Sequence, residues 1–180
     1  MKNRQYHANA EKSADRFGLL PGNKFYFAAI LFSFFVPFLI GHFKDLPMQL
    51  FVGTAVNFLL TFAALKFSAR QTLPIILLPA LGAYFSGFVF GSASIYLLYL
   101  IPFIWAGNAI YAISIRKIKN FVSVPIASFL KAGLIFCSTL ACVSLSIVPA
   151  VFLLPMGLMQ LITALAGGCI GFLFIKNALK

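Results

Sequence analysis

The sequence predicts an all-α integral membrane protein with six transmembrane helices and both termini in the cytoplasm. Composition is the first reason, because 62% of the 180 residues are apolar and only 9% are charged, whereas about 25% are charged in soluble proteins. The second reason is that residues 71–115 and 132–175 form two long stretches without a charged side chain. The third is that the 14 Lys and Arg residues, which give a net charge of +11, lie mainly between the apolar stretches.

Each uncharged stretch is long enough to cross a membrane twice. A helix over residues 71–115 would be about 68 Å long at 1.5 Å per residue, roughly twice the thickness of the hydrocarbon core. The chain therefore has to turn inside this stretch, and the small or polar residues 91–94 mark the turn. The stretch 132–175 requires a second hairpin for the same reason, and Pro149 marks the end of its first arm.

The other boundaries follow from charged or proline-containing connections. Lys44, Asp45 and Pro47 separate the first span from the second, and Lys66 and Arg70 end the second. The predicted spans are 25–43, 48–65, 73–90, 95–115, 124–148 and 152–175. A transmembrane domain, 25–176, therefore lies between a polar cytoplasmic tail, 1–24, and a short cytoplasmic end, 177–180.

The placement of positive charge predicts the orientation of the spans. With a cytoplasmic tail, twelve of the 14 Lys and Arg residues are cytoplasmic, at positions 2, 4, 12, 16, 24, 66, 70, 116, 117, 119, 176 and 180. Such an excess is typical of cytoplasmic loops, so we expect a multi-pass protein of the bacterial cytoplasmic (inner) membrane. Because the basic residues flank apolar spans and share no common face, they indicate contact with the lipid bilayer and exclude nucleic acid as a partner.

Prolines and small residues within the spans predict how the helices pack. Pro37, Pro79, Pro102 and Pro155 either shape single helices or bend them around a cavity, and both interpretations stay open. Small residues recur at four-residue spacing, which lets helices in lipid approach closely. They are Gly133, Cys137 and Ala141 in the fifth span and Ala164, Gly167, Gly168 and Gly171 in the sixth. We therefore expect these two spans to pack tightly against each other.

Polar side chains within the spans are the candidates for a ligand site. Lys131 is the one charge clearly inside a span. Either its stem extends to the membrane surface, or Asn108 and the backbone near Pro102 hold its ammonium group inside the protein. Asn57 and Gln160 lie nearer mid-membrane, where they either bond neighbouring helices or contact a ligand. The predicted ligand-binding residues are Asn57, Tyr84, Trp105, Asn108, Lys131 and Gln160.

Residue patterns of catalysis and metal binding are missing from the sequence. No Asp or Glu lies inside a predicted span, and no phosphate-binding or dinucleotide-binding glycine motif occurs. Cys137, Cys142 and Cys169 form no paired or His-containing cluster, so we interpret them as packing residues. The sequence therefore predicts no catalytic residue, no metal site and no cofactor, and a transporter or accessory subunit in place of an enzyme.

In layout the chain resembles the substrate-binding S component of energy-coupling factor transporters. The resemblance lies in six helices within about 180 residues, cytoplasmic termini, a basic tail and no carboxylate at depth. It implies a subunit that captures a vitamin-like molecule or a metal from outside, while a separate transmembrane coupling subunit and ATPases supply the energy. The family's Ala-x-x-x-Ala docking face is matched by residues 29–33, with Ala29 first and Ser33 in the second position.

Two local segments resemble a group of uncharacterised small bacterial membrane proteins. These segments are residues 78–82, LPALG, and residues 99–108, YLIPFIWAGN. Some members of the group are labelled iron hydrogenase, although this sequence lacks the thiolates that an iron–sulfur cluster needs. The alternative function is therefore a non-catalytic accessory or scaffold subunit of another membrane complex, for example one associated with a hydrogenase.

Overall fold

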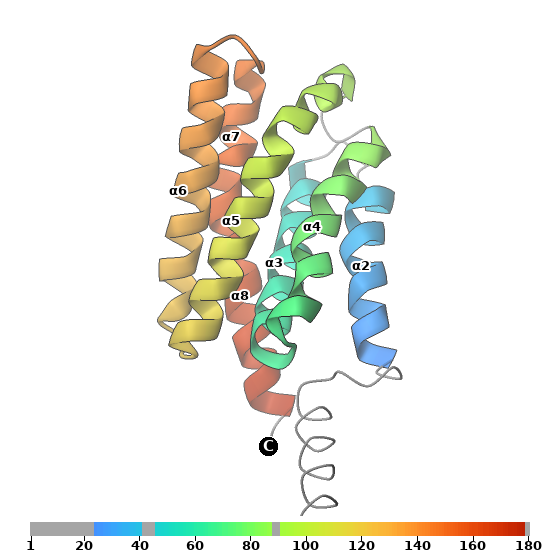
Figure 1. Ribbon diagram of the computed structural model, residues 1–180, viewed down its shortest axis with the longest axis vertical. Coiled ribbons are helices and arrows are strands. Elements are labelled where there is room, and N and C mark those ends of the chain that lie inside the picture. Colours follow the sequence, from blue (N-terminus) through green and yellow to red (C-terminus); the bar gives the residue numbers. More distant parts are fainter. Residues whose placement is uncertain (1–23, 41–45, 88–90, 179–180) are drawn as a thin grey trace, which may run out of the picture.

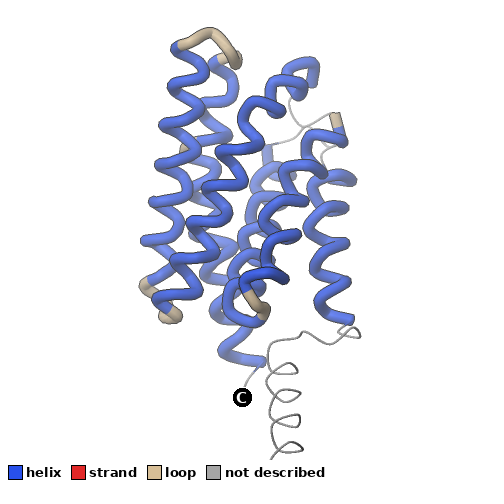
Figure 2. The backbone as a smooth tube through the Cα atoms, viewed as in Figure 1, coloured by secondary structure: helices blue, strands red, loops and turns tan. Residues whose placement is uncertain are grey.

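The computed structural model describes residues 24–40, 46–87 and 91–178, and these residues form an all-helical bundle (Figures 1 and 2). The predicted tail up to residue 23, the Lys44–Asp45 connection and the last two residues lie outside the described residues. The described part contains six long helices, one at each predicted span. They are α2 (Lys24–Ile40), α3 (Leu46–Lys66), α4 (Ala69–Ser86), α5 (Leu97–Ile118), α6 (Ser123–Ser144) and α8 (Leu158–Ala178).

Four helical segments are long and apolar enough to cross a membrane. They are residues 49–66, 93–118, 123–144 and 150–176. These four suffice for a multi-pass membrane protein. Helix α2 is apolar but has 17 residues, and α4 does not belong to this set.

The third predicted span is shifted, because its helix begins and ends at local signals. Ser68 caps the start of α4: its Oγ accepts a hydrogen bond from Gln71 N at 3.3 Å, and Gln71 Oε1 accepts one from Ser68 N at 3.0 Å. At the other end, Gly87 takes the left-handed conformation with φ 67° and donates to Tyr84 O. The helix therefore stops before residue 90. The expected turn at 91–94 is part of a 3₁₀ helix, η1 (Gly91–Tyr96), that leads into α5.

The sixth predicted span is broken at Gly157. It begins with η2 (Ala150–Phe152) and α7 (Leu153–Met156), and α8 follows after the break. Gly157 has φ −107° and ψ −94°, which is not helical geometry. A Cβ atom at this position would lie 2.7 Å from Phe136 Cδ2, so the glycine also permits the close approach of α6.

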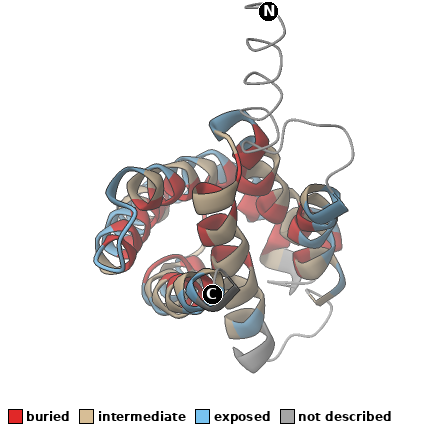
Figure 3. Cartoon of the chain, turned by 90° about the horizontal axis from the view of Figure 1, so that it is seen from below, coloured by how far each residue is buried: buried red, intermediate tan, exposed pale blue. Residues whose placement is uncertain are grey.

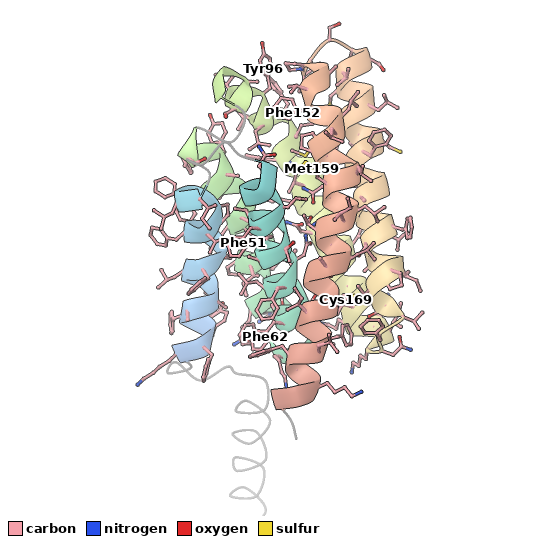
Figure 4. All side chains as sticks on the ribbon, turned by 180° about the vertical axis from the view of Figure 1, so that it is seen from behind. Phe51, Phe62, Tyr96, Phe152, Met159 and Cys169 are labelled. Atoms are coloured by element: carbon pink, nitrogen blue, oxygen red, sulfur yellow. The ribbon has the colours of Figure 1, made fainter. Side chains whose placement is uncertain are left out.

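The long helices pack in pairs across the bundle. Helix α2 packs mainly against α4, α3 against α8, and α5 against α6, and α2 and α6 lie at opposite sides (Figure 1). Buried residues line the sides on which the helices face one another (Figure 3). Two apolar clusters fill the interior, one toward the end where the C-terminus lies and one toward the opposite end, as the positions of Phe62 and Phe152 illustrate (Figure 4).

The small residues of the last span face both α3 and α6, so the expected tight pairing of the fifth and sixth spans is confirmed in part: a Cβ atom at Gly168 would lie 2.6 Å from Val124 Cγ1 on α6. A Cβ atom at Gly167 would collide with Thr54 O, and one at Gly171 would lie 2.9 Å from Thr61 Cβ. On α6, by contrast, Gly133, Cys137 and Ala141 are exposed. The four-residue spacing identified a close helix contact on α8, but the partner helix depends on the tertiary arrangement.

Candidate functional site

A cavity of about 140 Å³ lies among the helices, in the half of the bundle opposite the C-terminus. Its position follows from the lining residues, which come from the end of α2, the second half of α4, the first halves of α3 and α8, α5 up to Asn108, Lys131 of α6, and α7 (Leu153–Met156). The wall residues are Pro37, Ile40, Gln49, Val52, Gly53, Val56, Asn57, Pro79, Ala80, Ala83, Leu97, Ile104, Asn108, Lys131, Pro155, Met156, Met159, Gln160 and Thr163.

The cavity brings together four of the six predicted ligand-binding residues. They are Asn57, Asn108, Lys131 and Gln160, which come from four different helices. The sequence analysis missed two further polar wall residues, Gln49 and Thr163. A threonine or a terminal glutamine in an apolar helix is too common to indicate a site. Only the spatial arrangement selects these two.

Three of the four prolines that were expected either to shape single helices or to bend them around a cavity line this cavity. Pro37, Pro79 and Pro155 belong to its wall, whereas Pro102 does not. A proline has no N–H to donate to the carbonyl four residues before it, and its ring clashes with that carbonyl, so the helix bends at this point. Of the two open interpretations, the arrangement of helices around a cavity therefore applies at these three positions.

Lys131 lies inside the protein and does not extend to the membrane surface. Its side chain is 2% exposed, and Nζ donates a hydrogen bond to Asn57 Oδ1 at 2.7 Å. Nζ also lies 5.6 Å from the centre of the Tyr111 ring, within the range of a cation–π contact. Both expectations for this side chain are therefore wrong. The stem stays inside the protein, and its partner is not Asn108, because Asn108 Nδ2 donates to Ile76 O at 3.1 Å.

Asn57 is held in the orientation that Lys131 requires. Its Nδ2 group donates to Gly53 O at 2.8 Å and to Thr163 Oγ1 at 3.3 Å. Both donor hydrogens are therefore used on the side away from Lys131, and Oδ1 is left to accept from the ammonium group. Thr163 is itself fixed, because its hydroxyl donates to Met159 O at 2.8 Å.

The ammonium group of Lys131 has no carboxylate partner in the described part of the chain. The sequence contains three acidic side chains, Glu11, Asp15 and Asp45, and none of them lies in residues 24–40, 46–87 or 91–178. A buried charge is costly unless it is paired, and one neutral amide compensates only part of that cost. The site is therefore suited to an anionic group placed beside Nζ.

A second incomplete hydrogen-bonding group lines the same cavity. Asn108 is 1% exposed, and its Oδ1 atom is buried without a hydrogen-bond partner among the described residues. The bond from Nδ2 to Ile76 O fixes the orientation of the amide, since exchanging the two atoms would place two oxygens together. An acceptor of this kind is satisfied by a water molecule or by a ligand donor after a small shift.

The structure does not bring the other two predicted ligand-binding residues to the cavity. Trp105 Nε1 donates to Leu77 O at 3.0 Å, which ties α5 to α4. Tyr84 is half-buried, and its ring packs against Phe85 with the centroids 5.5 Å apart. Neither residue belongs to the cavity wall.

The predicted docking residues of the first span lie on the inner face of α2. Ala29 is 7% exposed and Ser33 is fully buried, with its hydroxyl donating to Ile30 O at 2.7 Å. Close packing at this face takes place within the chain, because Phe34 O on α2 lies against Gly82 of α4. In this arrangement a partner helix would have to contact other residues of α2.

Metal-binding side chains are not grouped in the part of the chain that the structure describes. No cluster of three or more His, Cys, Asp or Glu residues occurs there. Cys137 is exposed, Cys142 is buried and Cys169 is partly buried, and all three are free thiols.

No protein-family model, no curated protein and no solved structure matches this chain.

Proposed function

We propose that this chain is a ligand-binding subunit of a membrane uptake system, comparable in role to the S component of an energy-coupling factor transporter. The observation that carries the proposal is Lys131, a buried ammonium group in a cavity wall without a carboxylate partner in the described residues. An anion beside Nζ stabilises the charged form of Lys131, since an unpaired buried charge costs several kcal/mol.

The ligand is a small molecule with an anionic group, for example a carboxylate. The ammonium group attracts an anion and repels a metal cation, so of the two expected ligand classes the geometry favours a vitamin-like organic acid. The cavity volume of about 140 Å³ is close to that of engineered cavities that bind benzene. It therefore accommodates a ring-sized molecule, or only the acidic end of a larger one.

The proposed topology has six crossings with cytoplasmic termini. Helices α2 and α4, with 17 and 18 residues, would be about 26 and 27 Å long, close to the thickness of the hydrocarbon core. In this orientation the cavity belongs to the outer half of the bundle, as capture from outside requires. Reporter fusions after residues 45, 92 and 150 should read outside, and fusions after residues 69, 118 and 180 inside. An inside signal at residue 92 would contradict the topology.

The site is tested by identifying what the protein carries when it is purified from its own host. Native mass spectrometry of the detergent-solubilised protein should show a small organic acid bound to the wild type and lost from Lys131→Met. A matched control is Lys117→Met, which removes an exposed charge at the end of α5 and should keep the ligand. If neither protein carries a small molecule but both co-purify with other membrane subunits, the accessory role replaces the binding role.

A further inference from the structure

A second hollow, of about 500 Å³, lies at the end of the bundle where the C-terminus is found. Three segments that are distant in sequence line it: the end of α3, the connection between α5 and α6, and the last turns of α8. We propose that this hollow binds the phosphate headgroup of an anionic phospholipid. The proposal needs the membrane class of the protein but does not depend on the ligand at Lys131.

Three lysines surround the hollow. Lys66 lies at its α3 side, Lys119 in the connection and Lys176 on α8. Asn120 adds an amide, and no acidic side chain belongs to the described residues, so none of them neutralises these charges. Three like charges around one hollow repel one another, and an anion between them turns the repulsion into attraction.

The backbone position of Lys119 is unusual for a lysine. The residue has φ 56° and ends α5 in the left-handed conformation, with its N–H donating to Ile115 O at 3.0 Å. Glycine and asparagine are the residues that favour this position. A lysine at this helix end complements the negative end of the helix dipole, and it also places a positive charge beside the hollow.

Apolar walls distinguish a lipid from a free phosphate ion. The rings of Phe121 and Phe172 pack edge to face with centroids 6.1 Å apart. Phe121 is 53% exposed and Leu173 is 54% exposed, although both border the lysines. An inorganic anion gains nothing from such walls, whereas a phospholipid places its phosphate on the lysines and its glycerol and acyl groups on the rings.

The chain's own tail is a poor occupant of this hollow. Residues 1–23 contain Lys2, Arg4, Lys12 and Arg16 but only two acidic side chains, Glu11 and Asp15. This segment is net basic and is repelled by three lysines. An anionic lipid is the complementary partner that a membrane protein always has at hand.

The test compares two variants that remove the same number of charges. The first is Lys66→Gln, Lys119→Gln and Lys176→Gln together. The control is Lys24→Gln, Arg70→Gln and Lys117→Gln, three exposed residues outside the hollow. Native mass spectrometry in detergent, with phosphatidylglycerol or phosphatidylcholine added, should show phosphatidylglycerol bound preferentially. Its affinity should fall about tenfold in the first variant and no more than about threefold in the control.

Several outcomes would overturn the proposal. Equal losses of phosphatidylglycerol affinity in the two variants would show that the hollow binds no more strongly than other charged surface. Equal binding of phosphatidylglycerol and phosphatidylcholine would show that headgroup charge does not matter. Displacement of phosphatidylglycerol by millimolar inorganic phosphate would identify a site for the free ion. A second measurement avoids variants altogether: in nanodiscs, phosphatidylglycerol should protect Lys66, Lys119 and Lys176 from acetylation relative to Lys24 and Lys117. Equal acetylation of both groups would contradict the proposal.

Discussion

The two halves of the bundle differ in how their helices are kept together or apart. In the half near the C-terminus, Gly167 and Gly171 bring α8 against α3, and no large side chain separates the two helices. In the opposite half, Pro37, Pro79 and Pro155 line a cavity. Close glycine contacts also occur in the cavity half, at Gly82 against Phe34 O and at Gly157 against Phe136. The difference between the halves is therefore the cavity and its three prolines, which the packed half does not have.

A chain of hydrogen bonds joins the two halves. The Tyr111 hydroxyl lies 3.1 Å from Ala164 O and 2.9 Å from Thr61 Oγ1, and the Thr61 hydroxyl lies 2.9 Å from Asn57 O. Two hydroxyl protons serve these three contacts, so at any moment one contact lacks a proton. The chain ends at the residue that bonds Lys131, which connects the packed half to the floor of the cavity.

The same difference appears in the two basic side chains that point into the protein. Arg116 donates from Nε to Ala64 O and from Nη2 to Phe67 O, both at 3.1 Å, and from Nη2 to Thr72 Oγ1 at 2.7 Å. Its guanidinium therefore bonds carbonyls at the end of α3, where the helix dipole favours a cation. Lys131 has one amide oxygen and one aromatic face. Arg116 therefore links α5 to the end of α3, whereas the Lys131 ammonium group can donate further hydrogen bonds to another partner.

The largest expected effect is that of removing the oxygen that Lys131 bonds. Asn57→Leu leaves the ammonium group buried without an acceptor and should destabilise the protein by about 3–4 kcal/mol. Lys131→Met alone should cost less, about 1–2 kcal/mol, because it removes the buried charge but leaves Asn57 Oδ1 without its donor. The measurement is thermal unfolding of each purified variant in the same detergent.

The double variant and a matched asparagine separate pairing from simple packing. Adding Lys131→Met to Asn57→Leu should restore most of the stability, since the stranded charge is then gone. Asn108→Leu removes one bond to Ile76 O, should cost about 1 kcal/mol, and should not be rescued by Lys131→Met. Losses that simply add for Asn57 and Lys131 would show that the two side chains do not depend on each other.

A smaller effect, about 2–3 kcal/mol, is expected from filling the close contact of the packed half. Gly167→Leu would force a side chain into Thr54 O and Asn57 Cβ on α3. Gly133→Leu is the control, because a Cβ atom there meets nothing within 4 Å. Thermal unfolding should rank the first variant well below the wild type and the second close to it. Equal effects would mean that α8 does not lie against α3 as described.

The smallest effect concerns the hydroxyl that joins the two halves. Tyr111→Phe should cost about 1 kcal/mol, because it removes the shared contacts with Ala164 and Thr61 but keeps the ring under Lys131. Tyr99→Phe, on a ring that is 55% exposed, should cost almost nothing. Equal unfolding midpoints for the two variants would show that the Tyr111 hydroxyl does not contribute to stability.

Hydropathy and charge predicted a helix at every span, because uncharged stretches of this length have few alternatives. The predicted helix ends were less accurate. The Ser68–Gln71 cap starts α4 at Ala69, before the predicted start at residue 73, and Gly157 interrupts a span whose composition looks continuous. Polarity within apolar spans identified four cavity residues. Their pairing was predicted wrongly: depth estimated from the sequence favoured Asn108, whereas the rotation and packing of the helices bring Asn57 to Lys131.

The most direct test of the cavity is a set of three ligands that share a ring and differ in charge: benzoate, benzyl alcohol and benzylamine. Thermal unfolding in detergent should show that benzoate stabilises the wild type in a concentration-dependent way, that benzyl alcohol does so weakly, and that benzylamine does not. In Lys131→Met the preference for benzoate should disappear while the protein without ligand still unfolds in one cooperative transition. Stabilisation by benzylamine, or an unchanged benzoate effect in Lys131→Met, would contradict an anion site at Lys131.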